Sequence, residues 1–377
     1  MKFTKIIICI CFSLLILCLH TYAYDISEVD KEIDTKSLWE AVPDEIKDYI
    51  PDGYIENFSL SNVSQNTDNY FLIKFTGTCI SKLFPSVVKT LFSFLSVIIL
   101  VSVIRSMNHS FVQPFFSKTI NYFSLMVLAI FIYNHLVSLR ASFLVFVECI
   151  NTLTNSMIPI MSALCLMGGN VTSATVFPAG LAFLLTIINK ITTSGLIPML
   201  NICFGLSVAG IIGNMPGISF ITGSIKKLFT IVLTGALTLL SVFVMFKTML
   251  SSASDGVMAR GIKFAGSFVP IVGSALGESV RGVMSGLDLI KKSVGFIGLI
   301  IILVITLPPV ITLILNLLCA EFLSGMASVL RCEKESLLLK EYSGLLGALL
   351  SVSFCLSVTL IFVLTVYINL SSALGGV

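Results

Sequence analysis

The chain is 377 residues long, and 56% of its residues are hydrophobic while 11% are charged. Soluble domains carry roughly 25% charged residues, and the mean hydropathy here is +1.02, so a soluble globular domain is excluded. We expect an all-α, polytopic helix bundle embedded in a lipid bilayer, with no nucleic acid as a partner.

Residues 1–23 have the pattern of a secretory signal peptide. Lys2 and Lys5 form a basic start, residues 6–19 an apolar core, and Thr21, Tyr22 and Ala23 a cleavage site. We expect cleavage after Ala23, and an uncleaved first anchor is the alternative. Either version places the following segment outside the cytoplasm.

Residues 24–83 are predicted to form a small acidic extracytoplasmic region. They hold twelve Asp and Glu against five Lys, a net charge of −7, whereas the residues after them hold sixteen Lys and Arg against eight Asp and Glu. Because the region has few apolar residues, it can bury little core alone. We therefore expect it to dock on a partner.

The membrane part contains seven apolar runs long enough to span a bilayer. They are 84–104, 121–139, 176–189, 196–212, 228–246, 294–318 and 345–370. A further run, 143–167, contains Glu148 and Pro159 and can span, re-enter or lie flat. The prediction is therefore seven or eight spans, with a first membrane block at 84–250 and the last two spans within 294–377.

Positive charges near span ends favour the cytoplasm, which gives a test of the ambiguous run. If 143–167 spans, seven Lys and Arg fall inside and eight outside; if it does not, nine fall inside and six outside. The second topology is weakly favoured. It places the cations between 247 and 292 inside, and Lys226, Lys227, Arg331, Lys334 and Lys340 outside.

Signatures of catalysis are absent from the sequence. There is no HExxH, GxSxG or P-loop, and seven cysteines outside the signal peptide are scattered without a CxxC pair. Glu148 and Glu321 are the acids nearest bilayer depth, and a structural role is favoured for both. We expect no enzyme, no catalytic residue, no cofactor and no metal site.

Residues 251–293 are too polar to span and too apolar to form a loop. Pro270 separates two predicted amphipathic helices, 254–268 and 271–292, and glycines at four-residue spacing allow close helix packing. The helix pair either closes the bundle at the interface or lines a pore or subunit contact. The helix-packing or pore-lining candidates are Gly273, Gly277, Gly282, Gly286, Arg260, Lys263, Glu278 and Arg281.

Two adjacent prolines interrupt the run 294–318. Proline lacks an amide hydrogen, so Pro308 and Pro309 should break this helix or tilt its second half. Such breaks persist in lipid where neighbours satisfy the freed carbonyls, which suggests a lined cavity, although ordinary kinked packing is favoured. The hinge candidates are Pro270, Pro308 and Pro309.

The glycine-rich segment also carries a family resemblance. The block DGVMARGIKFAGSFVPIVG at 255–273, with KSVG at 292–295, IPIMSALCLMGG at 158–169 and the last two spans, resembles the stage III sporulation protein AE family. The resemblance implies a multi-pass protein of the mother-cell membrane around the forespore. It also implies a role in a secretion-like channel complex that sustains the forespore after engulfment, and it supplies no catalytic residues.

The expected function is thus that of a non-enzymatic membrane subunit of this channel complex. Its expected partners are the other membrane and intermembrane subunits, with a cytoplasmic ATPase of the same operon and a homo-oligomer left open. A stand-alone secondary transporter or permease is one alternative, against which the absence of a visible inverted repeat speaks. A structural anchor that only recruits other subunits is the second.

Overall fold

The computed structural model describes residues 70–111, 114–167, 171–215, 217–235, 237–239, 242, 246 and 273–368. These residues are helical apart from short turns at 213–215 and 330–332, and no strand occurs among them. The helices are α5 (Tyr70–Phe111), α6 (Pro114–Met167), α7 (Val171–Ile191), the π-helical turn η1 (Thr192–Leu196), α8 (Ile197–Ile212), α10 (Gly273–Val329) and α11 (Glu333–Ile368). A further helical segment, Gly217–Leu239, follows α8. The expected all-α membrane bundle is confirmed.

Six helices in the described part of the chain are long and apolar enough to cross a membrane, where seven or eight were expected. The difference arises because the runs 121–139 and 143–167 belong to one uninterrupted helix, α6. Likewise, α7, η1 and α8 join 176–189 to 196–212 without a turn. Arg140 does not end α6, because arginine is a good helix former, and its guanidinium Nη1 donates to Asn201 Oδ1 at 3.3 Å. The two apolar runs on either side of Arg140 therefore belong to one helix, and the exact number of membrane crossings stays a prediction.

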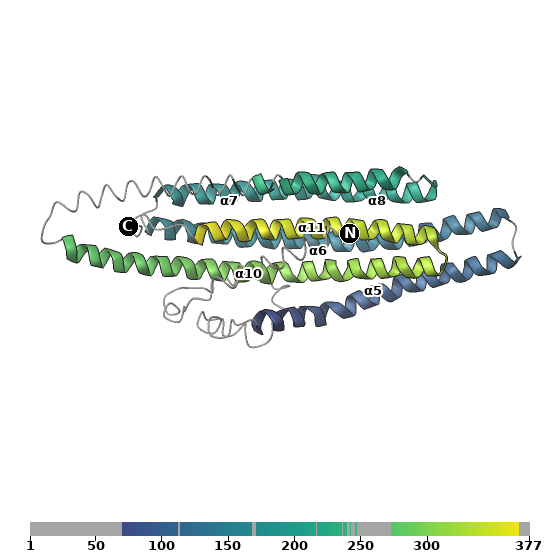
Figure 1. Ribbon diagram of the computed structural model, residues 1–377, viewed down its shortest axis with the longest axis horizontal. Helices are drawn as coiled ribbons and strands as arrows, with labels where there is room; N and C mark the ends of the chain where they lie inside the picture. The colour runs from purple at the N-terminus through teal and green to yellow at the C-terminus, as the bar shows by residue number, and fades with distance from the viewer. Residues whose placement is uncertain are drawn as a thin grey trace.

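The helices lie along one long axis, with α10 and α11 as an antiparallel hairpin, α5 on one side and α7 and α8 on the other (Figure 1). About two thirds of the apolar stretch of α10 (67%) and of α11 (61%) is buried, against 22% for α5 and 18% for Gly217–Leu239. The hairpin is therefore the core of the bundle. The two least buried helices have apolar outer surfaces that suit contact with lipid.

The α5, α8 and α10 helices all end near the same end of the bundle (Figure 1). Arg105 near the end of α5 donates from Nη1 to the carbonyl oxygen of Arg331, in the turn between α10 and α11, at 3.0 Å. The weakly favoured topology placed these two residues on opposite sides of the membrane and is therefore wrong. A count of charges could not reveal a contact between residues so far apart in the sequence.

The start of α10 and the end of α5 lie at opposite ends of the bundle (Figure 1). From Gly273 onward, the predicted amphipathic helix 271–292 is part of α10, which runs without a break from Gly273 to Val329. At 1.5 Å per residue its 57 residues extend roughly 85 Å, well over the ~30 Å of a bilayer core. The glycine-rich part of α10 therefore precedes its apolar span, Gly298–Val329.

Candidate functional site

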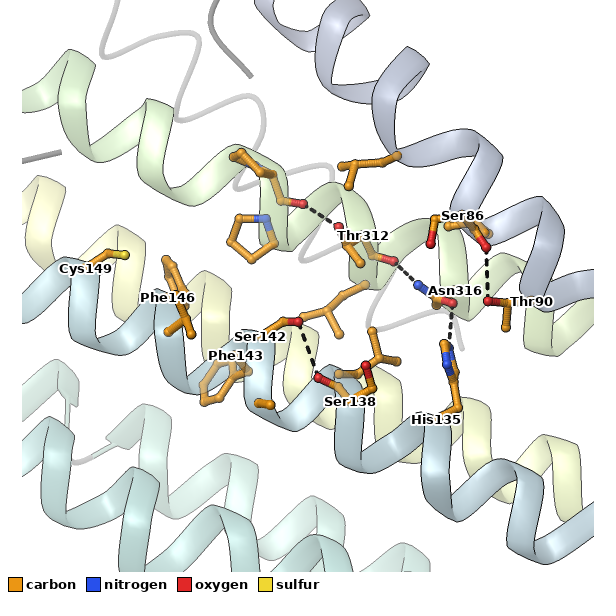
Figure 2. Close-up of a pocket in the computed structure, with 18 of the residues that line it drawn as sticks. Ser86, Thr90, His135, Ser138, Ser142, Phe143, Phe146, Cys149, Thr312 and Asn316 are labelled. Atoms are coloured by element: carbon orange, nitrogen blue, oxygen red, sulfur yellow. Dashed lines mark hydrogen bonds between the residues drawn. The ribbon is translucent and has the colours of Figure 1, made fainter. Parts of the chain in front are cut away.

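A cavity of about 480 Å³ lies between α5, α6 and α10 (Figure 2). Apolar side chains such as Leu83, Phe143 and Leu313 form much of its wall. Its polar lining consists of Ser86 and Thr90 from α5, His135, Ser138 and Ser142 from α6, and Thr312 and Asn316 from α10. A mixed wall of this kind, apolar with a few placed polar groups, is typical of small-molecule sites.

The wall contributed by α10 is built around Pro308 and Pro309, both of which line the cavity. Neither proline has an amide hydrogen, so neither can supply the helical hydrogen bond to the carbonyl four residues earlier, on Val304 and Ile305. The helix nevertheless continues through both prolines, so a break does not occur, and a tilt of its second half stays a prediction. Its next turn is tied down by the Thr312 hydroxyl, which donates to the carbonyl oxygen of Pro308 at 2.9 Å.

His135 projects from α6 toward Asn316 on α10 (Figure 2). The Asn316 amide Nδ2 donates to the carbonyl oxygen of Thr312 at 2.8 Å, so its Oδ1 is the atom that faces His135 Nε2, at 2.9 Å. Because an amide oxygen can only accept, Nε2 of His135 carries the hydrogen. In the uncharged imidazole Nδ1 is then an acceptor.

Two aromatic rings pack against the imidazole of His135. Phe94 of α5 and Tyr342 of α11 lie edge-on to His135, with ring centroids 5.9 Å and 6.3 Å away. The Tyr342 hydroxyl is buried and has no hydrogen-bond partner among the described residues. An unpaired buried hydroxyl costs about 1–3 kcal/mol, so the ring packing must offset that cost.

A buried ion pair joins α5 to the start of α11. Arg105 Nη2 donates to both carboxylate oxygens of Glu335, at 2.9 Å and 3.2 Å, and the Glu335 side chain is 0% exposed. The hydroxyl of Ser124 on α6 donates to Glu335 Oε1 at 3.2 Å. One carboxylate therefore fixes three helices at the end of the bundle where α5, α8 and α10 finish.

Glu341, a second carboxylate of α11, binds α8 and the helical segment Gly217–Leu239. Lys226 Nζ lies 2.9 Å from Glu341 Oε2, and the hydroxyls of Ser207 and Thr222 donate to the same oxygen at 3.3 Å. Six residues of helix turn through about 600°, equivalent to 240°, so Glu335 and Glu341 leave different faces of α11. This spacing lets one helix hold partners on both of its sides.

The Cys332 thiol lies in the turn between α10 and α11, outside the apolar spans. Burial raises the pKa of this thiol above its ordinary value, and the nearby Arg105 guanidinium offsets only part of the rise. Since the thiolate is the reactive form, Cys332 stays protonated and unreactive at neutral pH.

Comparison with known proteins identifies the family. A model of the stage III sporulation protein AE family matches residues 55–373. The chain belongs to this family. The Stage III sporulation protein AE of Bacillus subtilis (strain 168) is 24% identical over 213 residues, which cover 55% of this chain and 53% of that relative. The chain thus matches about half the length of this relative, and no solved structure matches it.

The predicted glycine-rich candidates of this stage III sporulation protein AE family member are only partly described. Arg260, Lys263 and Pro270 lie outside the described residues. The other candidates belong to the first fourteen residues of α10, where the structure describes a helical backbone but not the surroundings of the side chains. They are Gly273, Gly277, Glu278, Arg281, Gly282 and Gly286. Their packing or pore-lining role stays a prediction.

The sequence predicted only two residues of this family member's cavity, Pro308 and Pro309. Pro308 and Pro309 were predicted as hinge candidates, but Thr312 and Asn316 were not predicted, although four-residue steps from Pro308 place both on its helix face. Of the two acids near bilayer depth, Glu148 is exposed, and Glu321 accepts a hydrogen bond from the Ser343 hydroxyl at 3.0 Å. The helical spacing from the prolines was the signal that could have found the α10 wall.

Proposed function

We propose that this sporulation protein is a non-enzymatic membrane subunit of a channel complex linking the mother cell and the forespore, required for forespore development after engulfment. We place it in the mother-cell membrane around the forespore. The family membership supports the link to sporulation, and the six apolar helices support the membrane location. The cavity between α5, α6 and α10 is proposed as the place where a solute is held in passage.

The observation that carries this proposal is a polar-lined cavity inside an apolar bundle. Seven polar side chains face it from three helices that are otherwise long and apolar. Polar groups within a membrane bundle are costly, and they mark pathways for substrates or ions more often than they serve packing alone. Pro309 leaves the backbone carbonyl of Ile305, a residue of the same wall, without its usual helical donor.

The proposed partners are the other membrane and intermembrane subunits of the complex. The acidic residues 24–83, most of which lie outside the described part, would meet basic partner surfaces through charge complementarity, and salt should weaken that contact. A cytoplasmic ATPase of the same operon would bind at the end of the bundle that carries Arg105, Lys226 and Lys334. A second copy of the chain is a further candidate partner.

A stand-alone secondary transporter is the second candidate, and the cavity beside Pro308 and Pro309 favours it. The two candidates differ in what the purified chain does alone. Solute uptake into liposomes that contain this chain and no other subunit would favour the transporter, whereas a subunit of a larger channel would give uptake only with its partners.

The test of the proposed function is a leucine at Ser142, which lies on the α6 wall of the cavity and is exposed there. The larger apolar side chain should fill part of the cavity without removing a buried contact, since the Ser142 hydroxyl only donates to the carbonyl oxygen of Ser138 in its own helix. We expect normal protein levels in the membrane and a loss of mature spores of about tenfold or more, as for a blocked polar pathway.

The matched control is Ser93→Leu. Ser93 is an exposed serine of α5 that donates to the carbonyl oxygen of Lys89 in the same way but does not line the cavity. Spore counts of this variant should equal those of the unmodified strain. Normal sporulation of the Ser142→Leu strain at equal protein level would contradict the proposed use of the cavity.

A further inference from the structure

The polar atoms of the cavity are mostly acceptors of hydrogen bonds. Three of its hydroxyls already donate their hydrogens to carbonyls of their own helices: Thr90 to Ser86, Ser142 to Ser138 and Thr312 to Pro308, at 3.1, 3.3 and 2.9 Å. A hydroxyl whose hydrogen is used in this way offers only its lone pairs to a ligand. Each of the three helices therefore contributes at least one hydroxyl oxygen that can only accept a hydrogen bond from a ligand.

The remaining polar groups of the cavity add further hydrogen-bond acceptors. His135 uses its Nε2 hydrogen on Asn316, which leaves Nδ1 of the uncharged ring as an acceptor. Pro309 cannot donate to the carbonyl of Ile305, a residue that also lines the cavity. The donors left for a ligand are the second Asn316 amide hydrogen and the hydroxyls of Ser86 and Ser138.

No Asp, Glu, Lys or Arg lines the cavity among the described residues. A carboxylate or phosphate held between apolar helices needs charge-assisted donors, and a full cation needs a counter-charge, because an unpaired charge in such surroundings is strongly disfavoured. The walls provide neither. A bare ion would also fill only a small part of a cavity of about 480 Å³, a volume that suits a small organic molecule.

We infer that this cavity binds a small uncharged solute that carries several hydroxyl or amide hydrogens, in the size range of a polyol or a monosaccharide, and that it rejects carboxylates and phosphates. The inference rests on the proposed function, since it names the class of solute for the same site. The solute's hydrogens would bond to Thr90, Ser142, Thr312 and His135, while its carbon skeleton would lie against Leu83, Phe143 and Leu313.

Thiol labelling of a cysteine in the cavity wall tests the inference directly. Ser142→Cys is made in the full-length chain in lipid nanodiscs, and the rate of N-ethylmaleimide addition at position 142 is followed by mass spectrometry of that peptide. Fragmentation of the peptide locates the adduct, which separates addition at position 142 from addition at the native Cys149, which also lines the cavity. Ser138→Cys, on the same wall, is the second variant, and Met215→Cys, an exposed position in the turn after α8, is the control.

Ribitol or glucose should slow labelling at position 142 by about tenfold at ten times the half-protecting concentration, and should leave position 215 unchanged. Glutamate and inorganic phosphate should not protect either position. Thr312→Val keeps the side-chain shape and removes one acceptor, so about fivefold more ribitol should be needed for the same protection.

The inference would be overturned if glutamate or phosphate protected as well as ribitol does. It would also be overturned if positions 138 and 142 both labelled and no neutral probe slowed the labelling, or if neither position labelled. These outcomes are separate from a failure of the proposed function. Normal spores from the Ser142→Leu strain would refute the use of the cavity in sporulation, whereas anion protection with a sporulation defect would refute only the solute class.

Discussion

Replacing Arg105 with alanine should destabilise the folded bundle by about 3–5 kcal/mol, because it leaves the Glu335 carboxylate buried without its cation. Glu335 is completely shielded from solvent and receives two bonds from Arg105, while the Ser124 hydroxyl supplies one bond without charge. The measurement is the unfolding free energy of the purified protein in detergent, followed by the loss of helical circular dichroism as SDS is added.

Arg140→Ala is the matched control for this change. Arg140 makes one hydrogen bond, to Asn201 at 3.3 Å, at an exposed position, so its loss should cost about 1 kcal/mol or less. Adding Glu335→Gln to Arg105→Ala should recover much of the stability, since the buried charge is then gone. If Arg105→Ala costs no more than Arg140→Ala, or if Glu335→Gln recovers nothing, the ion pair does not hold the three helices together.

Gly210→Ala should separate α8 from the helical segment Gly217–Leu239 and destabilise the protein by about 1–3 kcal/mol, the usual cost of overpacking. A Cβ atom at Gly210 would lie 2.8 Å from Ile218 Cβ and 2.9 Å from its Cγ2. Because the Ile218 Cβ is fixed to the backbone, the contact cannot be relieved by a side-chain rotation. The same SDS unfolding measurement reads the effect.

Gly205→Ala is the control on the same helix, one turn and a half earlier. Nothing lies within 4 Å of the Cβ that would be added there, so alanine should stabilise α8 by up to about 1 kcal/mol through its higher helix propensity. The two glycine variants should therefore shift stability in opposite directions. A loss of equal size at both positions would show that the close approach at Gly210 is not the cause.

The fold class could be predicted from the sequence because hydropathy alone decides it. Long apolar runs with few charges require helices in a bilayer, and the described helices confirm this. The number of spans could not be predicted, because a single arginine at position 140 looks like a loop when its partner Asn201 is unknown. A lone charged residue is compatible with a loop or with a continuous helix, and hydropathy does not distinguish the two.

The residue pairs that form the cavity and the ion pairs could not be predicted from the sequence either. Pro308 and Pro309 drew attention to the right part of α10 from their chemistry alone. His135 and Asn316, however, lie 181 residues apart, and Arg105 and Glu335 lie 230 apart. No local period encodes such pairs. The glycine-rich segment invited a prediction of close helix packing from its spacing. The close approach of Gly210 to the Ile218 Cβ atom, by contrast, was not predicted from the sequence.

The contact of Arg105 with Arg331 and the two ion pairs of α11 require the ends of α5, α8 and α10 to lie on one side of the membrane. Fusions of alkaline phosphatase and β-galactosidase after Lys118, Met215 and Lys292 measure this directly, since these positions lie outside the apolar spans. The bundle predicts the same side for the fusions after Lys118 and Met215, and the opposite side for the fusion after Lys292. Opposite sides for Lys118 and Met215 would contradict the arrangement on which the proposed function depends.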